Sequence, residues 1–182
     1  MLPTPARLER LTRLSRVMEV VTLVGMVLIG ILTALMFIIP EWTRNLVLAK
    51  LGEAGATLPI TVEGRLIAGL ITAVPLAVLL YGLWTVRRLF QEFARGRVLT
   101  TEAARCLQTF AVTVLAQAPL SPLAGAAISL ALTLTAQPGP KTVMLGISTN
   151  DYLALIIGGV LLAVATVMRE AARLAEENAS FV

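Results

Sequence analysis

The sequence predicts an all-α integral membrane protein with four transmembrane helices, both termini in the cytoplasm and a small β-hairpin on the outer side. Of its 182 residues, 57% are hydrophobic and only 14% are charged, and the mean hydropathy is +0.85. A soluble domain has about a quarter of its residues charged, so this composition is typical of a membrane protein. The few charged residues are also spaced so that they leave four long uncharged runs.

These uncharged runs define the four helices. An ionised side chain at the centre of a bilayer is costly, and about 20 residues of helix cross the hydrocarbon layer. Three of the runs have this length. The run between Arg105 and Lys141 is too long for one crossing, and its Gln-Pro-Gly-Pro stretch at 137–140 breaks a helix. We predict one membrane domain over residues 1–182, with spans at 17–39, 66–88, 102–130 and 151–176.

Two prolines, Pro119 and Pro122, lie inside the third predicted span. Each removes a backbone donor and crowds the preceding turn, so we expect a kink here. A kink that serves packing is the first interpretation. The alternative is a broken helix that lines a substrate path, with Gln117 as its polar companion.

The basic residues predict the orientation. Eleven of the fifteen lysines and arginines precede the first span, lie between the second and third spans, or follow the fourth. Basic residues are enriched in cytoplasmic loops, so both termini are predicted to be cytoplasmic. The absence of a second targeting feature indicates a bacterial inner membrane, with an organelle membrane as the alternative. The eleven are Arg7, Arg10, Arg13, Arg16, Arg87, Arg88, Arg95, Arg97, Arg105, Arg169 and Arg173.

The outer segments are predicted at residues 40–65 and 131–150. The first opens with an interfacial helical turn that carries Trp42, followed by alternating apolar residues over 57–63 that are typical of an edge strand. In the second, residues 131–136 and 142–148 resemble two short strands joined by the breaker stretch, which predicts the hairpin.

The inner segment between the second and third spans, residues 87–105, is here called the elbow. Gly96 is predicted to end one helix and Thr100 to cap the next. After the fourth span, we expect the helix to continue past the membrane, with Arg173 and Glu177 paired four residues apart.

Two stretches carry a family resemblance: LFQEFARGRVLTTEAARCL in the elbow and EENASFV at the end of the chain. They resemble the bacterial four-helix membrane family called domain of unknown function 2975. Members are often encoded beside a small helix-turn-helix regulator, so the resemblance implies a cytoplasmic regulatory partner. It implies no catalytic residues.

No catalytic, cofactor-binding or metal site is predicted, and we expect no enzyme. Histidine is absent, and the single cysteine, Cys106, is expected to pack inside the protein. Asp151 is predicted to cap the fourth helix. Glu19 is predicted to pair with Arg16 at the inner interface, with a proton or ion site as the alternative.

Small residues four apart suit close helix contact in lipid. The pairs are Gly69 with Ala73, Gly125 with Ser129, and Gly159 with Ala163. We expect them to pack inside the bundle, with contact between copies in a homo-oligomer as the alternative.

The predicted working surface lies on the elbow and the tail. It combines a basic patch, two neighbouring phenylalanines and an acidic end, which suits anionic lipid headgroups or a protein partner. Direct nucleic-acid binding is not expected, because no basic stretch alternates with stacking aromatic residues. We expect a membrane sensor or partner of a cytoplasmic protein; the alternative is a small transporter or lipid-binding subunit. The surface residues are Arg87, Arg88, Phe90, Phe93, Arg95, Arg97, Glu176 and Glu177.

Overall fold

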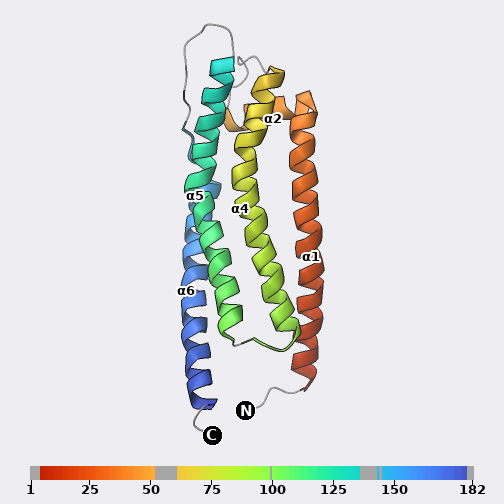
Figure 1. Ribbon diagram of the computed structural model, residues 1–182, viewed down its shortest axis with the longest axis vertical. Helices are drawn as coiled ribbons and strands as arrows, with labels where there is room; N and C mark the ends of the chain where they lie inside the picture. The colour runs from red at the N-terminus through yellow and green to blue at the C-terminus, as the bar shows by residue number, and fades with distance from the viewer. Residues whose placement is uncertain (1–4, 52–60, 99, 136–142, 144, 180–182) are drawn as a thin grey trace. The chain divides into compact units, whose positions relative to one another are not determined.

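The computed structural model describes residues 5–51, 61–98, 100–135, 143 and 145–179. For residues 5–11, 46, 47, 49–51, 178 and 179 only the backbone is described. These parts of the chain contain no strand, and their helices are α1 (Pro5–Ile38), α2 (Pro40–Leu51), α4 (Val62–Ala94), α5 (Thr101–Thr135) and α6 (Thr149–Ala179), as labelled in Figure 1.

Four of these helices are long and apolar enough to cross a membrane, which confirms the predicted number of spans. The candidate spans are Thr12–Ile38, Val62–Ala94, Thr101–Thr135 and Thr149–Glu177. The predicted spans lie inside these helices, except that the first extends one residue past the end of α1. α4 and α5 continue through their internal prolines, which are Pro75, Pro119 and Pro122.

The chain forms two compact units. Unit 1 comprises residues 1–26, 79–115 and 155–182, and unit 2 comprises residues 27–78 and 116–154. Each of the four long helices contributes residues to both units. The single membrane domain over residues 1–182 stays a prediction.

The predicted outer hairpin is wrong: none of its residues that the structure describes, which are 131–135, 143 and 145–148, lies in a strand. Residues 131–135 form the last turn of α5 instead of a strand. The hydroxyls of Thr133 and Thr135 donate to the carbonyls of Ser129 and Ala131, at 3.0 Å in both cases. Such bonds let threonine remain in a helix despite its preference for strands. Residues 136–142 lie outside the described part of the chain.

The predicted edge strand is wrong at its end, where α4 begins. The backbone N–H of Gly64 donates to the Thr61 hydroxyl at 3.0 Å, so Thr61 is the N-cap of α4. Val62 is the first helical residue rather than the last of an alternating strand. Residues 57–60 of this prediction lie outside the described residues.

At the start of α6, the predicted cap is a reciprocal pair. The backbone N–H and hydroxyl of Ser148 donate to the Asp151 carboxylate, each at 2.8 Å, and the Asp151 N–H donates to the Ser148 hydroxyl at 3.3 Å. Ser148 is therefore the N-cap, and Asp151 completes a capping box.

In unit 2, the helical turn predicted after the first span is the twelve-residue helix α2. Pro40 opens it, where a missing backbone N–H costs nothing. The Thr43 hydroxyl donates to the carbonyl of Met36 at 2.6 Å, and Thr43 is only 1% exposed. This bond ties the first turn of α2 to the end of α1.

Close helix contacts in unit 1 depend on two glycines that were not singled out from the sequence. A Cβ at Gly82 would lie 2.3 Å from Oγ1 of Thr113, and one at Gly158 would lie 2.7 Å from Cγ of Leu115. Both glycines are buried. Ala165 and Ala172 follow Gly158 at seven-residue intervals and are also buried, so a narrow stripe of small side chains forms the packed face of α6.

The predicted small-residue pair on α6 does not pack inside the protein. A Cβ at Gly159 would have no atom within 4 Å, and Ala163 is exposed. Internal packing of this pair is therefore wrong, because α6 turns the neighbouring Gly158 inward.

The other two predicted pairs lie in unit 2. A Cβ at Gly69 would lie 3.5 Å from the Phe37 ring, an ordinary contact. Ser129 is buried at 1% exposure, whereas a Cβ at Gly125 would meet no atom within 4 Å. Contact between copies of the chain stays a prediction.

Candidate interaction surface

The backbone of the elbow has the predicted helix end and cap. α4 ends at Ala94, and Gly96 follows with a φ of 76°, a left-handed conformation that favours glycine. At the start of α5, the backbone N–H of Ala103 donates to the Thr100 hydroxyl at 3.2 Å. Both predictions are confirmed, and the elbow is fixed at its two helix ends.

The inner side of the elbow is a small apolar core. Leu89, Ala103 and Cys106 are buried together, with Phe93 and Leu107 packed against them. Cys106 therefore packs inside the protein, as predicted. Phe93 belongs to this core and joins α4 to α5.

Of the two predicted aromatic residues, Phe90 is half-buried. Phe93 contributes to the core of the elbow. Phe93 is half-buried as well. Truncation of Phe90 is therefore the variant that leaves the described core of the elbow unchanged.

Arg95 and Arg97 share one carboxylate. Arg95 Nη1 lies 2.9 Å from Oε1 of Glu92, and Arg97 Nε lies 3.1 Å from Oε2 of the same side chain. The Glu92 side chain is 13% exposed, whereas the arginine side chains are 60% and 56% exposed. The elbow thus presents two guanidinium groups to solvent, held from beneath by a partly buried carboxylate.

Arg87 is used to join two helices. Its Nε lies 3.3 Å from Oε1 of Glu19 on α1, and the Gln91 amide donates to the same oxygen at 2.7 Å. Glu19 was predicted to pair with Arg16, and the structure corrects this. The carboxylate is directed across to α4, where two donors one turn apart reach it.

Arg88 lies on an aromatic face. Its guanidinium carbon is 3.9 Å from the centroid of the Trp84 ring. The Tyr81 ring is tilted against Trp84, with 6.2 Å between centroids. A guanidinium at this distance is attracted by the ring, so Arg88 has a preferred position while remaining exposed.

The two predicted tail residues have different neighbours. Oε1 of Glu176 accepts a hydrogen bond of 2.6 Å from the Thr101 hydroxyl at the start of α5. Glu177 lies 3.8 Å from Arg173, as predicted, and Arg173 also pairs with Glu170. The structure therefore brings Glu176 to the elbow and leaves Glu177 in contacts along α6.

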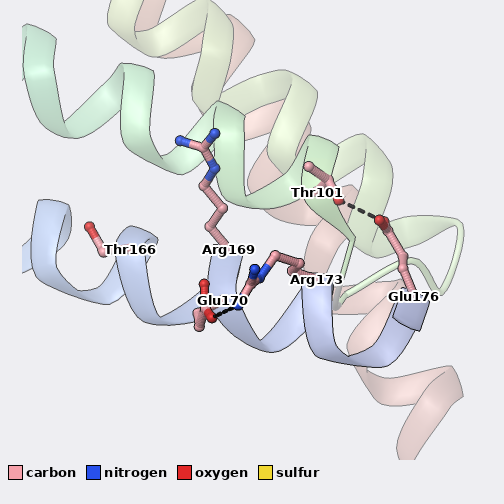
Figure 2. Close-up of a pocket in the computed structure, with 6 residues that line it drawn as sticks. All are labelled: Thr101, Thr166, Arg169, Glu170, Arg173 and Glu176. Carbon is pink, nitrogen blue, oxygen red and sulfur yellow. Dashed lines mark hydrogen bonds and ion pairs between the residues drawn. The ribbon is translucent and has the colours of Figure 1, made fainter. Parts of the chain in front are cut away.

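A groove of about 570 Å³ lies beside this tail contact in unit 1. Figure 2 shows α6 supplying most of its lining, with Thr101 contributed by α5. Arg173 and Glu176 were singled out from the sequence, but the groove itself depends on the approach of α5 to α6. The lining residues are Thr101, Thr166, Arg169, Glu170, Arg173 and Glu176.

In unit 2, Gln117 of the third predicted span forms a hydrogen bond between two helices. The Gln117 amide donates to the backbone carbonyl of Pro75 at 2.7 Å. This contact ties α5 to α4 within a largely apolar segment and supports the interpretation in which the proline region serves packing.

The described residues include no group of three or more His, Cys, Asp or Glu side chains placed to hold a metal ion. The described arginines and glutamates of the elbow and tail carry charge and form no such metal-binding group. In unit 1, exposed guanidinium groups stand beside carboxylates, a combination suited to anionic groups or to charged protein surfaces.

A family model matches the chain over residues 15–182, and its description is "Protein of unknown function (DUF2975)". The match covers all four candidate spans from near the start of the first. No curated protein matches the chain, and no solved structure does.

Proposed function

The chain belongs to this family of unknown function, and from that premise we propose that it is a non-enzymatic sensor or partner in the bacterial cytoplasmic membrane. In this proposal it holds a cytoplasmic protein, such as a helix-turn-helix regulator, on the elbow and tail. Its four long apolar helices make it a multi-pass membrane protein.

The observation that carries the proposal is the division of charge between the two units. All eleven basic residues that were predicted to be cytoplasmic belong to unit 1. The three other basic residues that the structure describes, Arg44, Lys50 and Arg65, belong to unit 2. Every ion pair found among the described residues also belongs to unit 1. Basic residues accumulate on the cytoplasmic side, which supports cytoplasmic termini and a cytoplasmic elbow.

The orientation is tested by labelling single cysteines from outside intact cells, in a Cys106→Ser background. Glu41 in α2 and Arg97 in the elbow are both exposed, so each accepts a cysteine without loss of packing. We expect Glu41→Cys to react in intact cells and Arg97→Cys to react only after lysis. The reverse result would contradict the proposed orientation.

The docking surface is tested by co-purification with the helix-turn-helix regulator that the family resemblance implies. The double variant Arg95→Gln, Arg97→Gln removes two exposed charges from the elbow. The control, Arg13→Gln with Arg16→Gln, removes two exposed charges from α1 in the same unit. We expect about a tenfold loss of bound regulator for the elbow variant, because a few central residues dominate most interfaces.

An equal loss in both variants would point to general charge attraction instead of docking at the elbow. Phe90→Ala measures the apolar contribution, since Phe90 is half-buried and Phe93 belongs to the elbow core. A regulator that binds all three variants as it binds the unaltered protein would contradict this docking surface.

A further inference from the structure

The groove between α6 and Thr101 holds an arginine without a partner in the described chain. Its two carboxylates are engaged, Glu170 by Arg173 and Glu176 by the Thr101 hydroxyl. Arg173 in turn lies between Glu170 and Glu177. Among the described residues Arg169 makes no such contact, although it lines the same groove.

The position of Arg169 in Figure 2 indicates what its guanidinium group is free to bind. The side chain extends from α6 toward the α5 side of the groove and away from the Glu170 and Arg173 pair. A guanidinium group offers five N–H donors in a planar fork, which matches the oxygens of a phosphate. Among the described residues that line the groove, the donors that stay without a partner are therefore those of Arg169, and they suit an anion.

The sequence places this anion site at the edge of the apolar layer. Arg169 is the first charged residue after the uncharged run that follows Asp151. Just before it on α6, Val164 is 45% exposed and Val167 is 70% exposed. In a membrane protein, exposed aliphatic side chains at this level contact acyl chains, while an arginine at the span end reaches the headgroup layer.

We propose that this groove binds the phosphodiester headgroup of a membrane phospholipid, with Arg169 as the phosphate ligand. The acyl chains then run along the exposed aliphatic side chains of α6. Arg173 contributes less, because two carboxylates already surround it. A soluble phosphate shares the headgroup chemistry but lacks the contact with the aliphatic surface, so the two ligands are separable by experiment.

The test is native mass spectrometry of the delipidated full chain with added phosphatidylethanolamine or phosphatidylglycerol. Arg169→Gln should weaken lipid binding by about fivefold to tenfold, since a charge-assisted hydrogen bond to an exposed group is lost. Arg16→Gln is the matched control, because Arg16 is an exposed arginine of the same unit that does not line the groove. It should change lipid binding by less than about twofold.

Thermal unfolding in detergent shows whether each variant is folded, and both positions are exposed. Equal lipid binding by Arg169→Gln and the unaltered protein would overturn the proposal. An equal loss in Arg16→Gln would also overturn it, because the attraction would then be a general charge effect. Competition by glycerol phosphate at the same concentration as the lipid would show a soluble phosphate site and overturn the assignment to lipid.

Discussion

Units 1 and 2 contain segments of the same four long helices, but the polar contacts described between those helices differ. Across the described residues, the ion pairs all lie in unit 1, where Glu19 joins α1 to α4. In unit 2, helices are joined by hydrogen bonds to backbone carbonyls, from Gln117 to Pro75 and from Thr43 to Met36.

The charges of unit 1 are therefore not all available for binding. Glu19, Arg87 and Glu92 are each used to fix a helix or a helix end. The charges that can still bind a ligand are those of side chains outside these contacts, such as Arg169 in the groove. A patch of basic residues in the sequence therefore overestimates the binding surface.

The largest expected effect comes from a packed glycine of unit 1. Its size shows whether helix packing contributes more than ion pairs to the stability of this unit. Gly158→Ala places a Cβ 2.7 Å from Cγ and 3.0 Å from the backbone nitrogen of Leu115. The backbone of α5 must shift, so we expect the free energy of unfolding to fall by about 1–3 kcal/mol. Unfolding by SDS, followed by circular dichroism, measures the change.

The adjacent glycine is the matched control for this prediction. Gly159 has nothing within 4 Å, so Gly159→Ala adds a methyl group to open space and should leave stability unchanged or slightly raised. Equal stability of the two variants would mean that α6 does not present Gly158 to α5.

A smaller effect is expected from the Glu19 and Arg87 pair, whose side chains are 26% and 34% exposed. Glu19→Gln leaves a half-buried guanidinium without its carboxylate. We expect a loss of about 1–2 kcal/mol, between the values typical of exposed and buried pairs. Thermal unfolding in detergent, with Glu41→Gln as an exposed control, measures this loss.

A double-mutant cycle with Arg87→Gln isolates the pair itself. We expect a coupling of about 1 kcal/mol, because the two side chains are in direct contact. A coupling free energy near zero would mean that the Glu19 and Arg87 pair does not stabilise unit 1. The pair would then not distinguish unit 1 from unit 2.

The sequence was sufficient for features that depend on local composition. The uncharged runs predicted the four spans, and Thr100 and Gly96 predicted the ends of the elbow. The predicted third span stopped at residue 130, five residues before the end of α5, and residues 131–136 were interpreted as a strand. Hydroxyl bonds to the helix backbone, which no periodicity reveals, explain that error.

Features that depend on which helix faces lie together could not be predicted in the same way. Glu19 and Arg87 are 68 residues apart, and no pattern in either segment selects the other as a partner. Gly158 and Gly159 are adjacent, yet only the first is packed. The rotation of α6 decides between them, and it places Gly158 against Leu115 of α5.

The smallest expected effect tests the hydrogen bond that joins α5 to α4 in unit 2. Gln117→Met keeps the length of the side chain but removes the donor to the Pro75 carbonyl. Side-chain hydrogen bonds between membrane helices average about 0.6 kcal/mol, so we expect a loss of that size in SDS unfolding. Gln108→Met, at a half-buried position of α5 in unit 1, is the matched control and should lose less. If the two variants are equally stable, the Gln117 hydrogen bond adds nothing, and the contrast between units rests on the ion pairs of unit 1 and the Thr43 bond of unit 2.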